Sequence, residues 1–213
     1  SYTLPEAKNS IAISPDMKYL AISHKPTEEL LKTVPSIRGD RKSWKPALKY
    51  RHMISIFDAE TFKLIKTIPE VYDIIYRMEF SEDGERLFNY SIPHTKMQTS
   101  TAGRQGYIFQ IGFPEMAPLR ASFLSLSPYE PDFLPNLKNG IIGVESFDRA
   151  PQLNLYHLKT GKMLDRFDTR MRLSAALSKK MAADSRASFV FLPDESVFMV
   201  TGNYAIRWTP NLE

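Results

Sequence analysis

The residues best suited to binding lie in one basic stretch in the first quarter of the chain. Cations and two aromatic residues alternate there, with Asp40 as the opposing acid, and we treat them as candidate partner-binding residues: Arg38, Arg41, Lys42, Trp44, Lys45, Lys49, Tyr50 and Arg51. Basic side chains bind anionic groups, and flat exposed rings supply stacking surface. The alternative is a solvated basic loop whose Trp44 packs down on the edge of the fold.

The charge balance of the whole chain narrows the kind of partner. The sequence has 28 Lys and Arg against 24 Asp and Glu, a net charge of +4 over 213 residues. This bias is mild, well below that of a dedicated nucleic-acid binder. The sequence therefore favours a protein partner with an acidic surface over a nucleic acid. An anionic membrane surface, contacted peripherally, fits the same residues.

A second candidate contact is the proline-rich stretch Pro128–Pro135, which holds Tyr129 and Phe133 between prolines. Aromatic side chains on a rigid frame lose little entropy on binding, which suits protein recognition. The same two rings could instead cover the gap between two structural repeats.

Residues for catalysis or metal binding are scattered in this sequence. The four histidines, His24, His52, His94 and His157, include no pair at metal-ligand spacing. Nucleophile-elbow, phosphate-loop, dinucleotide and His-Glu-x-x-His motifs are absent, and so is cysteine, which excludes thiol catalysis and zinc–thiolate sites. We expect no catalytic residues, no metal and no cofactor, although His24, His52 and His94 fall near strand ends and could converge on one face.

Three acidic residues recur at equivalent places, because Asp16, Asp83 and Asp194 each follow an apolar strand in a hairpin turn. Recurrence at one position favours turn chemistry, in which the carboxylate caps backbone N–H groups. Catalytic carboxylates are the less favoured alternative.

The strands around these turns form an internal repeat. Residues 11–23, 78–90 and 189–201 each have an alternating apolar strand, a tight turn and a second apolar strand. A second hairpin plan follows at residues 52–68 and 153–167. Self-similar segments of this kind indicate a fold built from similar structural units that follow one another along the chain.

Two motifs give the repeat a family resemblance. The Ser-Pro-Asp-x-x-x-Leu at Ser14–Leu20 and the Ile-x-Ile-Phe-Asp-x-x-Thr at Ile54–Thr61 resemble the strands of a WD40-like propeller blade and of its bacterial relatives. The Gly-His and Trp-Asp dipeptides of that family are missing. The resemblance implies an all-β fold of β-propeller-type repeats, with about four four-stranded blades in a single domain, residues 1–213. The expected blades are residues 9–68, 72–124, 132–167 and 188–209.

The last blade has no fourth strand before the chain ends at Glu213. We expect Ser1–Leu4 to pair beside Tyr204–Trp208 and close the ring, since propellers protect their edges in this way. A frayed N-terminus is the alternative. The chain is either a compact four-bladed ring or part of a larger propeller.

Three insertions interrupt the repeats. The longest, from His24 to Arg51, is expected to hold a helical turn at Thr27–Lys32 that ends at Pro35. Residues 93–106 are polar and are expected to form a flexible loop. Residues 168–187 predict a short amphipathic helix packed on the core, with binding of a partner as the less favoured alternative.

The sequence does not select a cellular compartment. No apolar run approaches the roughly 18–20 residues that span a bilayer, so we expect a soluble chain with no transmembrane segment. It begins at Ser1, and any leader has been removed from view, so the cytoplasm, the periplasm and the extracellular space all fit.

The sequence favours a non-enzymatic interaction or scaffold propeller that presents loops to a protein partner. One alternative is a small-ligand-binding or enzymatic propeller that uses the central channel. Another is a structural subunit completed by another chain.

Overall fold

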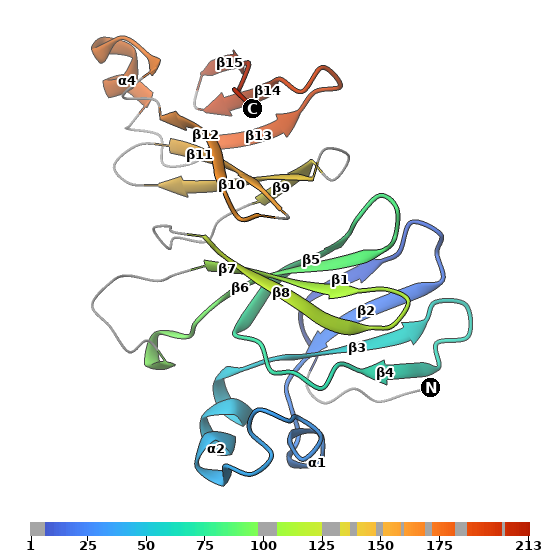
Figure 1. Ribbon diagram of the computed structural model, residues 1–213. Helices are drawn as coiled ribbons and strands as arrows, with labels where there is room; N and C mark the ends of the chain where they lie inside the picture. The colour runs from blue at the N-terminus through green and yellow to red at the C-terminus, as the bar shows by residue number, and fades with distance from the viewer. Residues whose placement is uncertain are drawn as a thin grey trace. The chain divides into compact units, whose positions relative to one another are not determined.

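A computed structural model describes residues 7–97, 106–124, 133–136, 140–147, 151–158, 160–168, 172–181, 187–201 and 203–213. The chain forms two compact units, residues 1–125 and 126–213 (Figure 1). That the whole chain is one domain stays a prediction.

The first unit holds two antiparallel sheets, each of four strands in chain order. The first sheet contains β1 (Ala7–Ile13), β2 (Tyr19–His24), β3 (Met53–Asp58) and β4 (Leu64–Thr67). The second contains β5 (Ile74–Phe80), β6 (Arg86–Ile92), β7 (Gly106–Gly112) and β8 (Ala117–Leu124).

The second unit also holds two antiparallel sheets. One has four strands: β9 (Phe133–Asn136), β10 (Ile141–Phe147), β11 (Pro151–His157) and β12 (Met163–Asp168). The other has three in the described residues: β13 (Ala187–Phe191), β14 (Val197–Thr201) and β15 (Tyr204–Trp208).

The predicted fold class is confirmed. Four antiparallel sheets follow one another along the chain, each joining neighbouring strands as a propeller blade does. The third strand expected in the last blade lies at Tyr204–Trp208, as the alternation predicted. Residues 1–4, expected to pair beside that strand, lie outside the described residues, so closure of the ring stays a prediction.

The recurrent aspartates cap the hairpin turns, which confirms that interpretation. Asp16 Oδ1 accepts hydrogen bonds from the Lys18 amide and the Ser14 hydroxyl, at 3.1 and 2.7 Å. Asp83 Oδ1 accepts from the Glu85 amide at 3.0 Å, and Asp194 Oδ1 accepts from the Ser196 amide at 3.2 Å. One turn chemistry is thus used in three sheets.

Each unit has its own core. In the first, Ala21, Ile54 and Ile56 of one sheet are buried in one cluster with Leu87 and Ile111 of the other. In the second, buried residues of the sheets β9–β12 and β13–β15 form a cluster that includes Leu153, Leu155, Phe189, Met199 and Trp208. Period-two alternation in the strands places these residues on one face.

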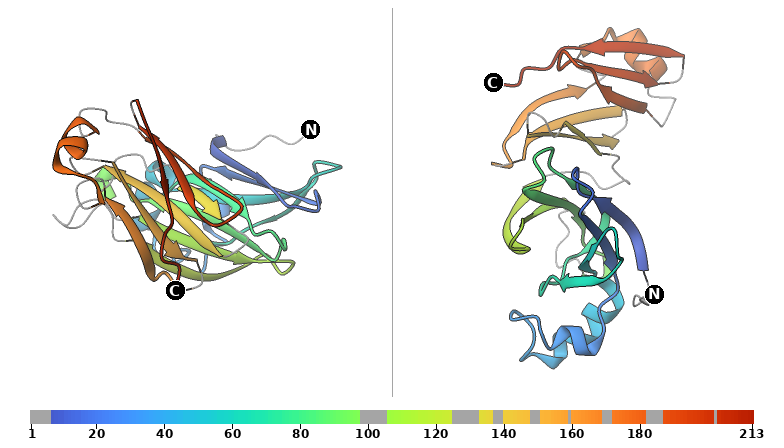
Figure 2. Two further views of the ribbon diagram at one scale, coloured as in Figure 1. Left: turned by 90° about the horizontal axis from the view of Figure 1, so that it is seen from above. Right: turned by 90° about the vertical axis from the view of Figure 1, so that its right-hand side faces the viewer.

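Helical segments occupy the insertions (Figure 2). The first insertion holds α1 (Glu28–Leu31) and α2 (Arg41–Tyr50), and a 3₁₀ turn spans Thr95–Met97. Helix α4 (Ala175–Met181) lies in the third insertion, and Leu173 and Leu177 pack against the core cluster of the second unit, as predicted. In the described part of the chain, none of the helices has the length and apolarity needed to cross a membrane.

The first insertion differs from the predicted basic loop, because its second half is the ten-residue helix α2. Asp40 caps the helix, and Trp44 and Ala47 are three residues apart on its buried face. Pro46 lies inside the helix and removes one backbone donor, but it does not end it.

Candidate functional site: a basic helical insertion

The insertion begins where β2 ends, and its first part is fixed by local hydrogen bonds. Thr27 caps α1, and its hydroxyl oxygen accepts from the Leu30 amide at 3.3 Å. The predicted helical turn at this place is confirmed. After α1 the chain turns through residues 33–40, where the amide of Arg38 donates to the carbonyl of Val34 at 2.9 Å. The two helices stand together at one end of the sheet β1–β4 (Figure 2).

Asp40 starts α2 and is fully engaged there. Its carboxylate accepts from the Lys42 amide at 3.0 Å and from the Ser43 hydroxyl at 2.5 Å. These bonds, led by the one from Ser43, lower the pKa of Asp40 below its usual value. Asp40 therefore acts as the cap of α2.

A small apolar cluster holds the insertion on the sheet. Leu31 and Val34 are buried together with Trp44 and Ala47 of α2, and Met53 and Val71 complete the cluster from the main body of the unit. Burial of this apolar surface, and not helix propensity, fixes α2 in place.

Trp44 corrects one part of the sequence interpretation. Its side chain is only 8% exposed, and its indole N–H donates to the carbonyl of Ile37 at 2.9 Å. An indole held in this way is not a free stacking platform. The alternative in which Trp44 packs against the fold describes it correctly.

Tyr50 and Arg51, at the end of α2, are also engaged. The Tyr50 ring lies against His94 with 4.4 Å between ring centroids, and Lys49 Nζ lies 5.5 Å from the Tyr50 ring centre. Arg51 faces Asp73 at 3.9 Å. Burial raises the pKa of Asp73, and the Arg51 charge opposes that rise.

The cations of the insertion remain largely unneutralised. Residues 24–51 contain eight Lys and Arg against three Asp and Glu, a net charge of +5, so all other residues together carry −1. Lys32 pairs with Glu29 and Arg51 faces Asp73. Five exposed cations of the insertion have no ion-pair partner among the residues that the structure describes: Arg38, Arg41, Lys42, Lys45 and Lys49.

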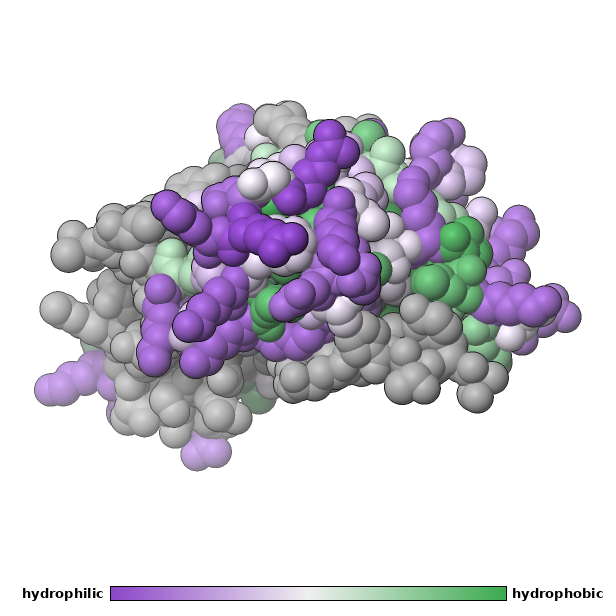
Figure 3. Space-filling model, turned by 90° about the horizontal axis from the view of Figure 1, so that it is seen from below, coloured by the Kyte–Doolittle hydropathy of each residue, from purple (hydrophilic) through white to green (hydrophobic). Residues whose placement is uncertain are grey.

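Three of these cations share one side of α2, since Arg41, Lys45 and Lys49 are spaced four residues apart. They border a groove between α1 and α2 of about 480 Å³, whose lining residues are Glu28, Lys32, Arg41, Trp44, Lys45, Leu48 and Lys49. In Figure 3, a view from below, hydrophilic side chains predominate among the coloured residues, with hydrophobic patches between them.

The groove includes residues that the sequence interpretation missed. Glu28 and Lys32 reach it from α1, a contact that only the folded insertion makes. Leu48 could have been found, because Trp44, Ala47 and Leu48 have helical spacing. The other predicted contact consists of Tyr129 and Phe133. Tyr129 lies outside the described residues, and Phe133 is the first residue of β9.

His24 pairs with Met53, the neighbour of His52, and His94 lies against Tyr50. His24 is buried, with Nε2 at 2.8 Å from the Ser55 hydroxyl and Nδ1 at 2.8 Å from the Lys25 carbonyl. His52 is buried, and its Nδ1 accepts from the Ile75 amide at 3.2 Å. In the described ranges, no three His, Asp or Glu side chains form a group that could hold a metal.

The His24–Ser55 pair has the residue types of a nucleophile and a base, but neither is accessible. A carbonyl oxygen only accepts, so His24 Nδ1 carries the proton toward Lys25, and neutral Nε2 accepts from Ser55. The Ser55 oxygen in turn lies 2.8 Å from the Thr67 hydroxyl. Burial lowers the pKa of His24, which favours this neutral arrangement, so the chain of bonds is structural.

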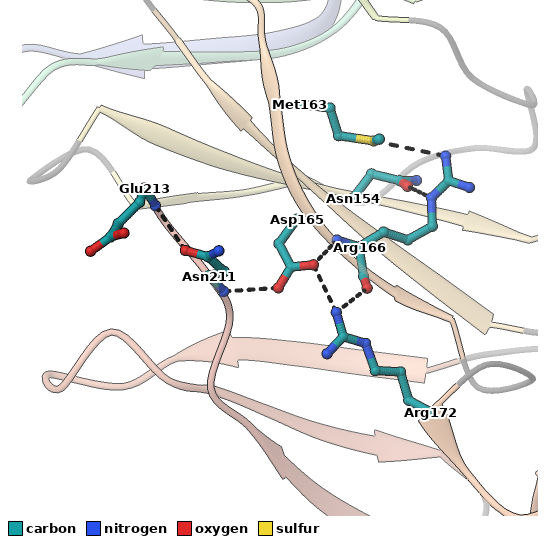
Figure 4. A network of polar contacts seen from close by, with 7 residues as sticks. All are labelled: Asn154, Met163, Asp165, Arg166, Arg172, Asn211 and Glu213. Atoms are coloured by element: carbon teal, nitrogen blue, oxygen red, sulfur yellow. Dashed lines mark hydrogen bonds and ion pairs between the residues drawn. The ribbon is translucent and has the colours of Figure 1, made fainter.

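A polar network in the second unit is likewise structural (Figure 4). Asp165 accepts from the Arg172 guanidinium at 2.8 Å and from the backbone amide of Asn211 at 2.8 Å. Arg166 donates to Asn154 at 2.7 Å. The carboxylate therefore joins β12 to the C-terminal residues, and both of its oxygens are used.

These sheets define the chain as a β-propeller-type repeat protein, and solved structures share the fold. Hydrazine synthase from Kuenenia stuttgartiensis superposes with a TM-score of 0.53 at 15% identity, over 91% of this chain and 44% of that one. Acylaminoacyl peptidase from Pyrococcus horikoshii gives 0.51 at 14%, over 92% and 28%. The WD40 repeats of RRP9 give 0.50 at 10%, over 97% and 52%.

At these identities the likeness establishes the fold alone. Two of the three structures are enzymes by name and one is a set of WD40 repeats, so the shared fold does not select a function. This chain spans about half or less of the length of each. No protein-family model and no curated protein matches the sequence.

Proposed function

We propose that this chain is a non-enzymatic, WD40-like propeller whose helical insertion binds a protein partner with an acidic surface. The observation that carries the proposal is the row of Arg41, Lys45 and Lys49 on α2, exposed and without ion-pair partners among the described residues. Such charges steer an acidic partner and fix its orientation. The motifs at Ser14–Leu20 and Ile54–Thr61 support the WD40-like assignment.

The packing of the insertion favours protein over nucleic acid or membrane. Stacking of bases needs free rings, whereas Trp44 is buried and Tyr50 lies against His94. Insertion into a membrane interface needs an exposed apolar helix face, whereas the apolar residues of α2 pack inward in the cluster with Leu31 and Met53. Tyr129 and Phe133 remain a proposed second contact.

The proposal is tested by affinity capture from native lysate. The bait is the chain itself or a variant in which Arg38, Arg41, Lys42 and Lys45 are replaced by Ser. These residues are exposed, so the variant is expected to keep its fold, which circular dichroism checks. A protein retained by the wild type and lost by the variant supports the proposal. Retention of the same proteins by both baits contradicts it. Binding of both baits to anionic lipid vesicles is measured in parallel, and a variant that loses only the vesicle binding would assign the surface to a membrane.

A second candidate function is that of a subunit completed by another chain, and one observation favours it. On the sheet β1–β4, Ile11 and Ile13 are 64% and 49% exposed and lie opposite Ile22 and Leu20, on the face turned away from the buried Ala21. On the sheet β13–β15, Val190 and Val200 are 49% and 43% exposed, again on the face opposite the core. Apolar faces of this kind mark association surfaces.

This second candidate predicts self-association or capture of a partner through sheet faces. Sedimentation velocity compares the oligomeric state of the wild type with that of an Ile11→Ser, Ile13→Ser double variant. An oligomeric wild type and a monomeric double variant support the second candidate function. Monomers in both cases, with unchanged capture of proteins, contradict it.

A further inference from the structure

The groove between α1 and α2 combines an apolar floor with a charged rim. Leu48 and the small exposed part of Trp44 supply the apolar part. Arg41, Lys45 and Lys49 of α2 stand around it, together with Glu28 and with Lys32, which is paired with Glu29. A volume of about 480 Å³ is in the range of sites that enclose a small group, and it exceeds what one side chain fills. The groove can therefore take one apolar side chain together with part of the backbone that carries it.

The floor of the groove is held in place before any partner arrives. Trp44 is fixed by its bond to Ile37 and by the packing of Ala47 and Leu31 in the same cluster. Arg41 lies over the indole, with 5.6 Å between Cζ and the ring centre. A fixed floor lowers the entropy cost of binding.

The rim sets the chemistry of the occupant. Lys32 is paired with Glu29, so the cations of the rim without an ion-pair partner among the described residues are Arg41, Lys45 and Lys49, all on α2. They favour a segment with several negative charges on the α2 side of the apolar residue. We propose that the groove binds a short acidic segment of a partner protein, with one leucine-like side chain seated on Leu48 next to the largely buried Trp44. This rests on the proposed function and names the part of the partner that is recognised.

Nuclear magnetic resonance can follow the indole N–H signal of Trp44, which is easy to assign because the chain has only two tryptophans. Trp44 is a lining residue of the groove, and its indole N–H signal reports on the ring; Trp208 is buried in the other unit and serves as an internal control. The probe is a short peptide of aspartate and glutamate around one central leucine, and its matched control has alanine in place of leucine.

Titration with the leucine peptide is expected to shift the Trp44 indole signal and leave that of Trp208 unchanged. The alanine peptide is expected to bind about tenfold more weakly, because it buries less apolar surface. The variant Lys45→Ser should weaken binding several-fold. Its matched control, Lys42→Ser, removes the same charge from the same helix outside the groove lining and should have a smaller effect.

Equal affinity for the two peptides, or an unmoved Trp44 signal, overturns the groove inference. If both peptides bind equally and Lys45→Ser weakens both, the basic surface still binds acidic partners and only the groove assignment fails. If lysate capture is unaffected by the loss of the four cations, the proposed function fails whatever the peptides do.

Discussion

The indole nitrogen of Trp44 donates a hydrogen bond to the backbone carbonyl of Ile37, 2.9 Å away, and so joins α2 to the turn that precedes it. This bond and the cluster around Trp44 make the insertion an ordered element, although it is rich in charge. The cations on α2 are therefore presented in a fixed pattern.

We expect Trp44→Phe to keep most of the packing but lose the bond, at a cost of about 1–2 kcal/mol to the ordering of the insertion. Trp44→Ala removes the packing too and should cost about 3–5 kcal/mol. Amide hydrogen exchange of α2 measures both. Protection of α2 should fall while that of β6 is retained, and unchanged exchange in Trp44→Ala would contradict this view of the insertion.

The buried chain from Thr67 through Ser55 to His24 predicts a pH dependence. Burial lowers the pKa of folded His24, so the unfolded chain takes up the proton more readily. The stability that the neutral ring provides is complete above about pH 6.5 and declines as the pH falls below that value. Urea unfolding as a function of pH should show this decline, and His24→Gln should flatten it.

The same chain predicts the effect of a single hydroxyl. Ser55→Ala leaves the buried Nε2 of His24 without its donor, and we expect a loss of roughly 1–3 kcal/mol in the free energy of unfolding. Chemical denaturation at neutral pH measures it. A loss near zero would mean that Ser55 is not the donor.

The turn aspartates are expected to titrate at low pH. Hydrogen bonds, led by the one from Ser14, lower the pKa of Asp16 to about 2. Bonds led by those from Ser81 and Ser196 lower the pKa values of Asp83 and Asp194. Stability from these groups is present above about pH 4 and is lost as the pH falls through the folded pKa values. Titration of the carboxyl-carbon resonances measures the pKa of each aspartate, and an ordinary pKa for Asp16 would contradict the capping geometry.

Two strand glycines form a matched pair for a packing test. A methyl group at Gly106 would meet the Tyr90 oxygen at 2.7 Å, and the Tyr90 ring is fully buried. A methyl group at Gly112 would meet Leu119 at 3.0 Å, but Leu119 is 55% exposed and can move aside. We expect Gly106→Ala to cost about 1–3 kcal/mol and Gly112→Ala much less. Thermal unfolding compares them, and equal effects would contradict the packing around Tyr90.

Much of the fold was predictable because the strands carry their signal locally. Alternation at Phe189–Phe191 and Tyr204–Trp208 marks strands, and the recurrent Asp16, Asp83 and Asp194 mark the turns between them. These features depend on neighbours in the sequence, so reading them needs no tertiary information.

The candidate site was predicted only in part. Its cations were found, but the stretch was expected to be a loop, whereas burial of Trp44 and Ala47 stabilises a helix there. The side of the groove formed by Glu28 and Lys32 depends on how α1 packs beside α2, a contact between residues distant in the sequence. No local pattern carries that information.

Removal of the whole insertion tests directly whether this segment binds the protein partner. His24 and Met53 are paired across β2 and β3, so residues 26–51 can be replaced by a two-residue Asn-Gly turn that continues this register and lets the two strands form a simple hairpin. Hydrogen exchange of the sheet strands verifies the fold, and the variant with four serines serves as a second bait. A protein captured by the wild type should be lost by both variants. Capture of that protein by the folded variant without the insertion would show that the insertion is not the binding surface.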